Sequence, residues 1–323
     1  MSIGIVLSTI EVRRSESFLR NADIALHHAK LNGKASYEIF NAEMHTRAVE
    51  RLQLETDLRR AIEREEFEVC YQPIVHLETR RVSGFEALVR WNHPTQGQVS
   101  PAKFIPIAEE TGLIVKLGSW VLRQACAQMW SWQQQFSCCH SMVISVNLSG
   151  RQFLQIDLLE QIERILSDTH LPPQSLKLEI TESVFMLRGE VTQAKVKCIK
   201  ELGIQISVDD FGTGYSSLSY LHRFPADTLK IDSSFIYQLA VNPENLAIVE
   251  AIVVLAHKLG MDVIAEGVET NEQLEQLRAI HCEQVQGYLF SPPLSADEST
   301  KLLQTRSSCG VGDQPWGFRS TNF

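Results

Sequence analysis

Short apolar segments of strand length alternate with longer amphipathic segments over most of this sequence, and the alternation restricts the folds open to the chain. The strand-like segments are residues 67–75, 82–91, 142–146, 176–180, 205–208, 228–231, 261–265 and 285–289. The helical patterns between them are residues 102–136 (interrupted near Gly112 and Gly118), 154–167, 189–202, 244–259 and 272–280.

The order of these segments predicts an α/β barrel. The first two strand-like segments are joined by residues 78–81, a link so short that it allows only antiparallel pairing. Eight strands alternating with helices predict a (β/α)8 TIM-like barrel with one antiparallel strand. A doubly wound open sheet is the alternative, but the glycine-rich phosphate turn that follows the first strand of such a sheet is missing here.

The N-terminal region has a different pattern. Residues 2–10 and 36–40 are strand-like and residues 16–31 are helical, too few elements to bury their apolar faces alone. A long charged helix without Pro or Gly is expected from residue 41 to about residue 65. We therefore divide the chain into the four expected parts that follow: a small α+β remnant at 1–43, a connecting helix at 44–65, the barrel at 66–305 and a flexible tail at 306–323.

Composition favours a soluble, cytoplasmic protein. The chain is 44% hydrophobic and 21% charged, and it has neither a signal-peptide pattern nor an apolar run near the ~18 residues of a membrane span. A net charge of −9 argues against binding to duplex nucleic acid. The seven cysteines form no CxxC pair, and adjacent Cys138 and Cys139 are poorly placed to share one zinc ion, so we expect reduced thiols.

Polar side chains occur at the ends of seven successive strand-like segments. They are Glu86 with Arg90, Asn147, Glu179 with Glu182, Asp209 with Asp210, Lys230 with Asp232, Glu266, and Gln286. In a barrel these ends meet on one face, where such enzymes build their sites. One lysine and one arginine cannot balance five of these carboxylates, which would repel one another and call for divalent cations; the five are Glu86, Glu179, Asp209, Asp210 and Glu266. Oxygen ligands favour Mg²⁺ or Mn²⁺ over zinc.

The acidic pair Asp209-Asp210 adds a detail of geometry. Neighbouring residues of a regular strand face opposite sides, so both can point inward only if the strand bends there, and glycines follow at Gly212 and Gly214. Two carboxylates on a bend can serve two adjacent ions, the arrangement used for in-line attack on a phosphodiester. Arg90 suits a phosphate oxygen. Lys230 either orients or helps to deprotonate the attacking water, or neutralises charge beside the metals.

Residues 71–292 resemble the EAL domain, the cyclic-di-GMP phosphodiesterase module. The motifs that carry the resemblance are Tyr71-Gln72-Pro73-Ile74-Val75, Glu86-Ala87-Leu88 with Arg90, Phe104-Ile105-Pro106-Ile107-Ala108-Glu109, Asn147-Leu148-Ser149, Glu179-Ile180-Thr181-Glu182, Asp209-Asp210-Phe211-Gly212-Thr213-Gly214, Lys230-Ile231-Asp232, Ala265-Glu266-Gly267-Val268-Glu269 and Gln286-Gly287-Tyr288. The resemblance implies a barrel with one antiparallel strand and Mg²⁺- or Mn²⁺-dependent hydrolysis of cyclic di-GMP to linear pGpG, with two ions.

The resemblance also implies a role for each matched residue. The first metal would be held by Glu86, Asn147, Glu179 and Asp209, and the second by Asp209, Asp210 and Glu266. Lys230 would lie near the attacking water, and Glu182 would steady the loop 210–218, so that the residues expected to serve catalysis are Lys230, Glu266, Asp210 and Glu182. The residues expected to contact the dinucleotide are Gln72, Leu88, Arg90, Asp232 and Gln286, of which Gln286 would also support the metal cluster.

The first 43 residues resemble the closing part of a GGDEF (diguanylate cyclase) domain, on Ser2-Ile3-Gly4-Ile5 and on residues 19–33. The nucleotide-binding signature of that domain is missing, so this chain is not expected to synthesise cyclic di-GMP. Either a longer protein supplies an upstream GGDEF or sensor region, or the remnant serves packing and dimerisation. A homodimer through the barrel is expected. The alternatives to an active enzyme are an inactive cyclic-di-GMP receptor and a docking scaffold.

Overall fold

The computed structural model describes residues 1–7, 15–31, 36–185, 189–213 and 224–307. Most of the expected tail at 306–323 and half of the loop 210–218 therefore lie outside the described residues. The chain divides into two compact units, one of residues 1–65 with 102–111 and one of residues 66–101 with residues from 112 onward. Each unit is described by itself.

The smaller unit pairs two short parallel strands, β1 (Ile3–Ile5) and β2 (Tyr37–Ile39), with helix α1 (Ser15–Leu31) between them in the chain. Its buried cluster is Ala25, Phe40 and Met44. The expected strands and helix are confirmed here, although the part of the first strand at 8–10 lies outside the described residues.

The long helix expected after residue 40 is also present, as α2 (Ala42–Ala61). The side chain of Asn41 caps it by accepting a hydrogen bond from the Met44 backbone N at 2.9 Å. In the same unit α2 carries Arg51, which forms an ion pair with Glu110 of α3 (Pro101–Thr111). Polar positions on α2 are thus used for a cap and for a pairing with a neighbouring helix.

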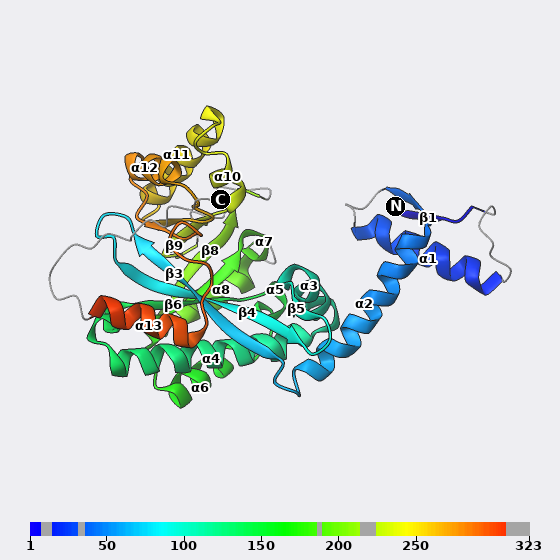
Figure 1. Cartoon of the computed structure of the whole chain (residues 1–323), viewed down its shortest axis with the longest axis horizontal. Helices are drawn as coiled ribbons and strands as arrows, with labels where there is room; N and C mark the ends of the chain where they lie inside the picture. The colour runs from blue at the N-terminus through cyan, green and yellow to red at the C-terminus, as the bar shows by residue number, and fades with distance from the viewer. Residues whose placement is uncertain (8–14, 32–35, 186–188, 214–223, 308–323) are drawn as a thin grey trace. The chain divides into compact units, whose positions relative to one another are not determined.

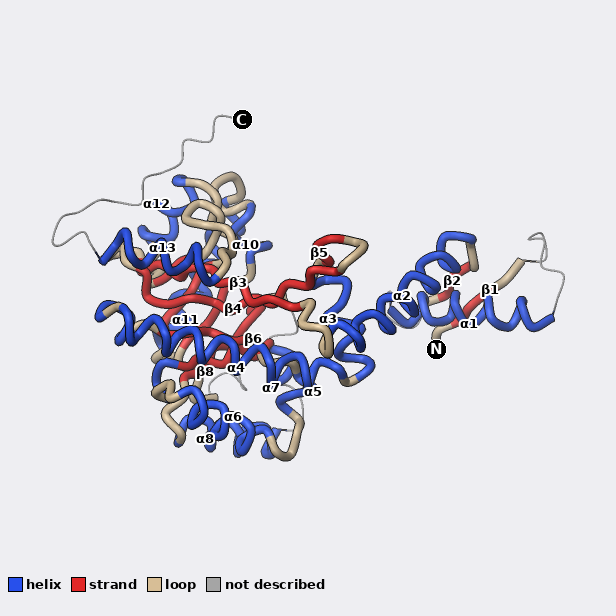
Figure 2. The backbone as a smooth tube through the Cα atoms, turned by 60° about the horizontal axis from the view of Figure 1, so that its bottom comes forward, coloured by secondary structure: helices blue, strands red, loops and turns tan. Residues whose placement is uncertain are grey.

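The larger unit is a closed barrel (Figures 1 and 2). Its strands are β3 (Phe67–His76), β4 (Val82–His93), β6 (Val143–Asn147), β7 (Leu176–Thr181), β8 (Gln205–Phe211), β9 (Thr228–Ile231), β10 (Asp262–Ala265) and β11 (Gln284–Val285). They pair in the order β3-β11-β10-β9-β8-β7-β6-β4, and β4 pairs again with β3 to close the ring. Strand β3 is antiparallel to both of its neighbours, while the other neighbours in the ring are parallel.

The closed ring confirms the TIM-like fold and excludes the open doubly wound sheet. The outer helices of this unit are α4 (Leu113–Gln135), α5 (Gly150–Phe153), α6 (Leu158–Thr169), α7 (Glu182–Phe185), α8 (Gly189–Glu201), α10 (Ser233–Tyr237), α11 (Pro243–Lys258), α12 (Asn271–Ala279) and α13 (Ala296–Ser307), with short 3₁₀ helices at Ser137–Ser141 and Pro173–Ser175. Figure 2 shows the strands enclosed by helices such as α4, α6 and α13.

Several boundaries differ from those expected. Helix α4 runs without a break through Gly118. The helix expected at 154–167 is present as α6 but begins four residues later, and the short helix α5 before it was not expected. The strand expected at 285–289 ends at Val285, because the backbone of Val268 hydrogen-bonds to Gln286 and Leu289 and draws this segment into a turn. The sequence patterns did not predict the terminal helix α13, the short helix α10 or strand β5 (Gly97–Val99), which extends β4 as a hairpin.

Alternation along the strands separates two environments. In β6, Ile144 and Val146 point away from the barrel axis and are buried under helices, whereas Ser145 and Asn147 lie on the inner face. In β8, Ser207 and Asp209 share that inner face. The interior is therefore unusually polar for a barrel of this type, whose inner layers are commonly filled by branched apolar side chains. Among the described helices, none has the length and apolar character needed to cross a membrane.

Ring closure depends on a residue without a side chain in β4. Gly84 pairs with Val143 of β6, and a Cβ added to Gly84 would lie 2.2 Å from the Val143 carbonyl oxygen. We predict that Gly84→Ala lowers the free energy of unfolding by about 1–3 kcal/mol, because backbone must move to relieve the overlap. Urea denaturation measures the change. Gln98→Ala, at an exposed position of β5, is the control and should change it by less than about 0.5 kcal/mol.

Candidate metal centre

The carboxylates at the strand ends converge on one buried ammonium group. The Nζ atom of Lys230, in β9, lies 2.5 Å from Oε1 of Glu266, 2.6 Å from Oε2 of Glu179, 3.3 Å from Oε2 of Glu86 and 3.4 Å from Oδ1 of Asp209. The lysine side chain is 1% exposed. Residues that are as much as 180 positions apart in the chain thus meet near the carboxyl ends of β7, β8 and β10, as the barrel prediction required, and Glu86 joins them from within the longer strand β4.

Two amide side chains donate hydrogen bonds to Glu86 in addition to its contact with the lysine. Nδ2 of Asn147 donates to Oε1 of Glu86 at 2.7 Å, and Nε2 of Gln286 donates to Oε2 at 2.7 Å. The same Nε2 group donates to Oε1 of Gln72 at 2.9 Å, and Nε2 of Gln72 donates to the Ser291 carbonyl at 3.1 Å. This chain of hydrogen bonds fixes the orientation of Glu86 before any ligand arrives.

The acidic pair at the end of β8 has the bend that the sequence predicted. Asp210 has a φ of +53° and Gly212 a φ of +97°, both in the left-handed region. Asp209, Asp210 and Glu266 offer carboxylate oxygens that all lie within 4.8 Å of one another. The backbone N of Gly212 lies 3.5 Å from Oε2 of Glu182, which is the contact expected between Glu182 and the loop after β8.

The donor set fits divalent cations. Four carboxylates face one ammonium, so most of the negative charge is not balanced by the protein. Oε1 of Glu179 and Oδ1 of Asp209 are buried without a hydrogen-bond partner, and burying such an atom unpartnered is costly. Carboxylate oxygens with the side-chain oxygen of Asn147 form the hard set that Mg²⁺ and Mn²⁺ prefer. The geometry therefore suits these ions at this rim.

Burial and mutual repulsion shift the protonation equilibria of the cluster. Burial raises the pKa of Glu266 to about 8 against the opposing effect of Lys230, and burial raises the pKa of Glu179 well above its usual range. Burial also acts on Glu86, but Lys230 and the amide hydrogen bonds outweigh it and lower the pKa of Glu86. The surrounding carboxylates overcome burial at Lys230 and raise its pKa well above the usual value. The cluster needs more positive charge to ionise fully.

The remaining expected residues lie around this rim without a hydrogen bond to the cluster among those described. Leu88 and Arg90 follow Glu86 at alternate positions of β4 and are half-buried, and the Nη1 atom of Arg90 donates to the Val89 carbonyl at 2.9 Å. Asp232 caps α10 by accepting from the Ser234 backbone N at 3.0 Å. These three side chains therefore border the cluster and do not belong to its hydrogen-bonded core.

Sequence reasoning missed two contributors to the site. The backbone carbonyl of Ser291 accepts a hydrogen bond from Gln72, and a pattern of side chains cannot predict a contact to backbone. Gly287 has a clearer signal, because a Cβ there would lie 2.1 Å from the Val268 carbonyl oxygen and only glycine permits the approach. The Gln286-Gly287 pair thus combines a side chain that holds Glu86 with a backbone that must pass close to the loop after β10.

Comparisons with known proteins place this architecture in one family. The family model described as "EAL domain" matches residues 55–293. The bifunctional diguanylate cyclase/cyclic di-GMP phosphodiesterase MucR of Pseudomonas aeruginosa is 42% identical over 297 residues, which are 92% of this chain and 43% of that protein. The cyclic di-GMP phosphodiesterase NbdA of the same organism is 41% identical over 293 residues, 91% of this chain and 37% of that protein. This chain spans less than half of the length of either relative.

A solved structure gives the same result. The PaMucR phosphodiesterase in complex with c-di-GMP superposes with a TM-score of 0.74 at 43% identity, covering 76% of this chain and 99% of that chain. The chain belongs to the EAL domain family.

Removal of the central ammonium tests the electrostatics of the cluster. We predict that Lys230→Met lowers the free energy of unfolding by about 3–5 kcal/mol in EDTA, because four carboxylates lose the cation that they share. Urea denaturation gives the value. Lys197→Met, at a lysine with a side chain 76% exposed on α8, is the matched control and should cost less than about 1 kcal/mol. A similar small loss for both variants would contradict the prediction.

Proposed function

We propose that this chain hydrolyses cyclic di-GMP to linear pGpG with the help of two Mg²⁺ or Mn²⁺ ions. The observation that supports this most is the convergence of Glu86, Glu179, Asp209 and Glu266 on Lys230 in a member of the EAL domain family. Relatives whose names include cyclic di-GMP phosphodiesterase, and a neighbour solved with c-di-GMP, support the choice of substrate.

The proposed ligands follow the geometry of the cluster. Glu86, Asn147, Glu179 and Asp209 hold the first ion, and Asp209, Asp210 and Glu266 hold the second. When bound, the two ions supply a more acidic water and neutralise charge on the phosphodiester. Asp210 shares the second site with Asp209 because the left-handed backbone at Asp210 breaks the strand alternation.

The protein groups then orient the reaction. Lys230 donates a hydrogen bond toward the attacking water and balances charge that develops at the phosphate. Gln286 and Gln72 keep Glu86 in place, while Arg90, Leu88 and Asp232 border the position of the dinucleotide. The water oxygen bonds to phosphorus as one P–O ester bond breaks, and the departing oxygen becomes a hydroxyl of pGpG. Glu182 steadies the backbone beside Gly212.

The assignment of residues 1–43 to the end of a GGDEF domain, the limits of the four parts of the chain and a homodimer through the barrel stay predictions. The barrel itself carries the residues that the proposed reaction uses. A purified full chain that binds cyclic di-GMP and never cleaves it with Mg²⁺ or Mn²⁺ would favour the receptor alternative.

The first experiment neutralises one metal ligand. We predict that Glu86→Gln lowers the Mg²⁺-dependent conversion of cyclic di-GMP to pGpG by about 10³-fold, on the scale of removing one group that stabilises transition-state charge. Chromatography of the products measures the rate, and a thermal melt shows that the fold persists. Glu160→Gln, at an exposed position of α6, is the control. Full turnover by Glu86→Gln would refute the assignment.

A second experiment changes the ion. We predict that Ca²⁺ supports far slower cleavage than Mg²⁺ or Mn²⁺, because its larger radius and looser coordination misplace the attacking water. The same chromatographic assay is run at saturating concentration of each ion. Equal rates in Ca²⁺ and Mg²⁺ would contradict a tightly defined two-ion geometry.

A further inference from the structure

The turn that follows β6 is held by a reciprocal cap. It begins directly after Asn147 and continues into α5, where the Oγ atom of Ser149 accepts from the backbone N of Gln152 at 3.3 Å. Oε1 of Gln152 in return accepts from the backbone N of Ser149 at 3.2 Å and from its Oγ at 2.8 Å. On the other side of the turn the backbone N of Leu148 donates to the Glu179 carbonyl at 2.8 Å. The two residues that follow Asn147 are therefore both fixed, Leu148 to β7 and Ser149 to the first turn of α5.

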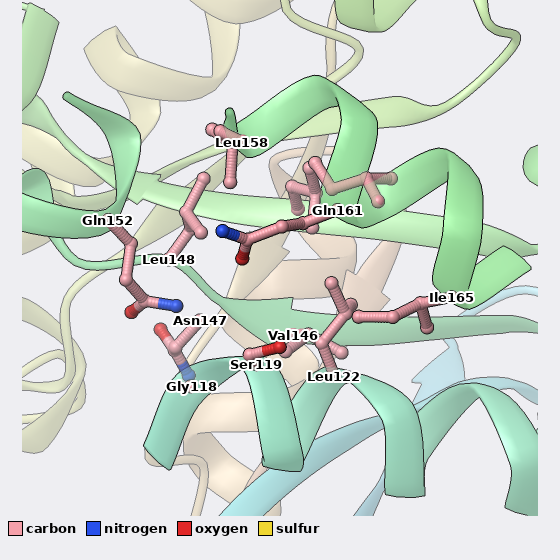
Figure 3. A pocket seen from close by; sticks show the side chains of 12 residues that line it. Gly118, Ser119, Leu122, Val146, Asn147, Leu148, Gln152, Leu158, Gln161 and Ile165 are labelled. Carbon is pink, nitrogen blue, oxygen red and sulfur yellow. The ribbon is translucent and has the colours of Figure 1, made fainter. Parts of the chain in front are cut away.

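The amide of Gln152 lies against a glycine in the second turn of helix α4. A Cβ added to Gly118 would lie 2.0 Å from Nε2 of Gln152 and 2.6 Å from its Oε1, and Gln152 is only 7% exposed. Figure 3 shows both residues lining one pocket with Asn147 and Leu148. Glycine costs about 1 kcal/mol relative to alanine inside a helix, yet α4 continues through it. The missing side chain makes room for the Gln152 amide.

Asn147 needs such support because its own environment is open. It is the last residue of β6 and is exposed, unlike the buried ligands Glu86 and Glu179. Within the described part of the chain, its side chain donates one hydrogen bond, from Nδ2 to Glu86. Mutation of groups that hold a metal ligand in place typically lowers metal affinity by about 10- to 100-fold.

We propose that Gln152, seated on Gly118, is a positioning residue that sets Asn147 for cation binding. This inference rests on the proposed function, because it takes Asn147 as a ligand of the first ion. Gln152 does not touch the ion or the substrate. It acts through the cap on Ser149, and the close approach at Gly118 prevents the amide from leaving that cap.

The test measures Mn²⁺ affinity of the full chain by electron paramagnetic resonance of free Mn²⁺, without substrate. Gln152→Leu, which removes the acceptor, should weaken Mn²⁺ binding by about 10- to 100-fold. Gln152→Glu keeps an acceptor at the cap and should stay within about threefold of wild type. Gly118→Ala should weaken binding like Gln152→Leu although helix propensity alone makes it stabilising. If Gln152→Leu does not fold, the Mn²⁺ affinity of Gly118→Ala decides the test.

Two comparisons separate positioning from a general effect on stability. Gln161, on α6, is another glutamine of the same pocket, and its Nε2 donates to Asp157 at 2.6 Å. The Gln161→Leu variant should bind Mn²⁺ as wild type does. In an Asn147→Ala background, Gln152→Leu should cause no additional loss, because its effect passes through Asn147. Unchanged Mn²⁺ affinity in Gln152→Leu, or a full additional loss in that background, would overturn the inference.

The same titration distinguishes this inference from the proposed function. A wild-type chain that binds no Mn²⁺ would overturn both. A wild-type chain that binds Mn²⁺ and cleaves cyclic di-GMP, with Gln152→Leu indistinguishable from it in both measurements, would overturn the positioning role and leave the proposed function in place.

Discussion

The organisation of the barrel depends on negative charge that is buried at one rim and shared around a single ammonium. Glu86, Glu179, Asp209 and Glu266 are close enough to Lys230 for each to form an ion pair with it. One cation cannot satisfy four carboxylates, and Oε1 of Glu179 and Oδ1 of Asp209 are buried without accepting a hydrogen bond. The cost of that arrangement must be offset by the rest of the fold, and the dications of the proposed function would relieve it.

The surrounding structure supplies rigidity at this rim. The amides of Asn147, Gln286 and Gln72 orient Glu86, and the left-handed backbone of Asp210 turns a second carboxylate toward the first. The buried carboxylates lower the stability of the fold, and in return the charges of the site are held in a fixed arrangement. The inner face of the barrel below the site is also polar, because Ser145 and Ser207 are buried there.

Sequence patterns predicted the barrel and the rim because both follow from local periodicity. Strand alternation and the position of Glu179 or Lys230 inside an apolar run could be read directly, and topology then brings the strand ends together. The patterns could not predict contacts between side chains that lie far apart, such as Gln286 with Gln72. They also wrongly predicted a helix interruption at Gly118. A glycine is needed there because Gln152 of α5 packs against it, and the conformation of α4 does not require one.

The reversed direction of β3 determines at which end of the barrel the chain enters the ring of strands. Phe67 at its start pairs with Trp91 near the end of β4, so the polypeptide enters the ring on the rim that carries the carboxylates. In a ring of strands that are all parallel, the chain would enter at the opposite end. The point of entry at Phe67 and Gln72, which accepts a hydrogen bond from the same Gln286 amide that holds Glu86, therefore lie on one strand, five residues apart.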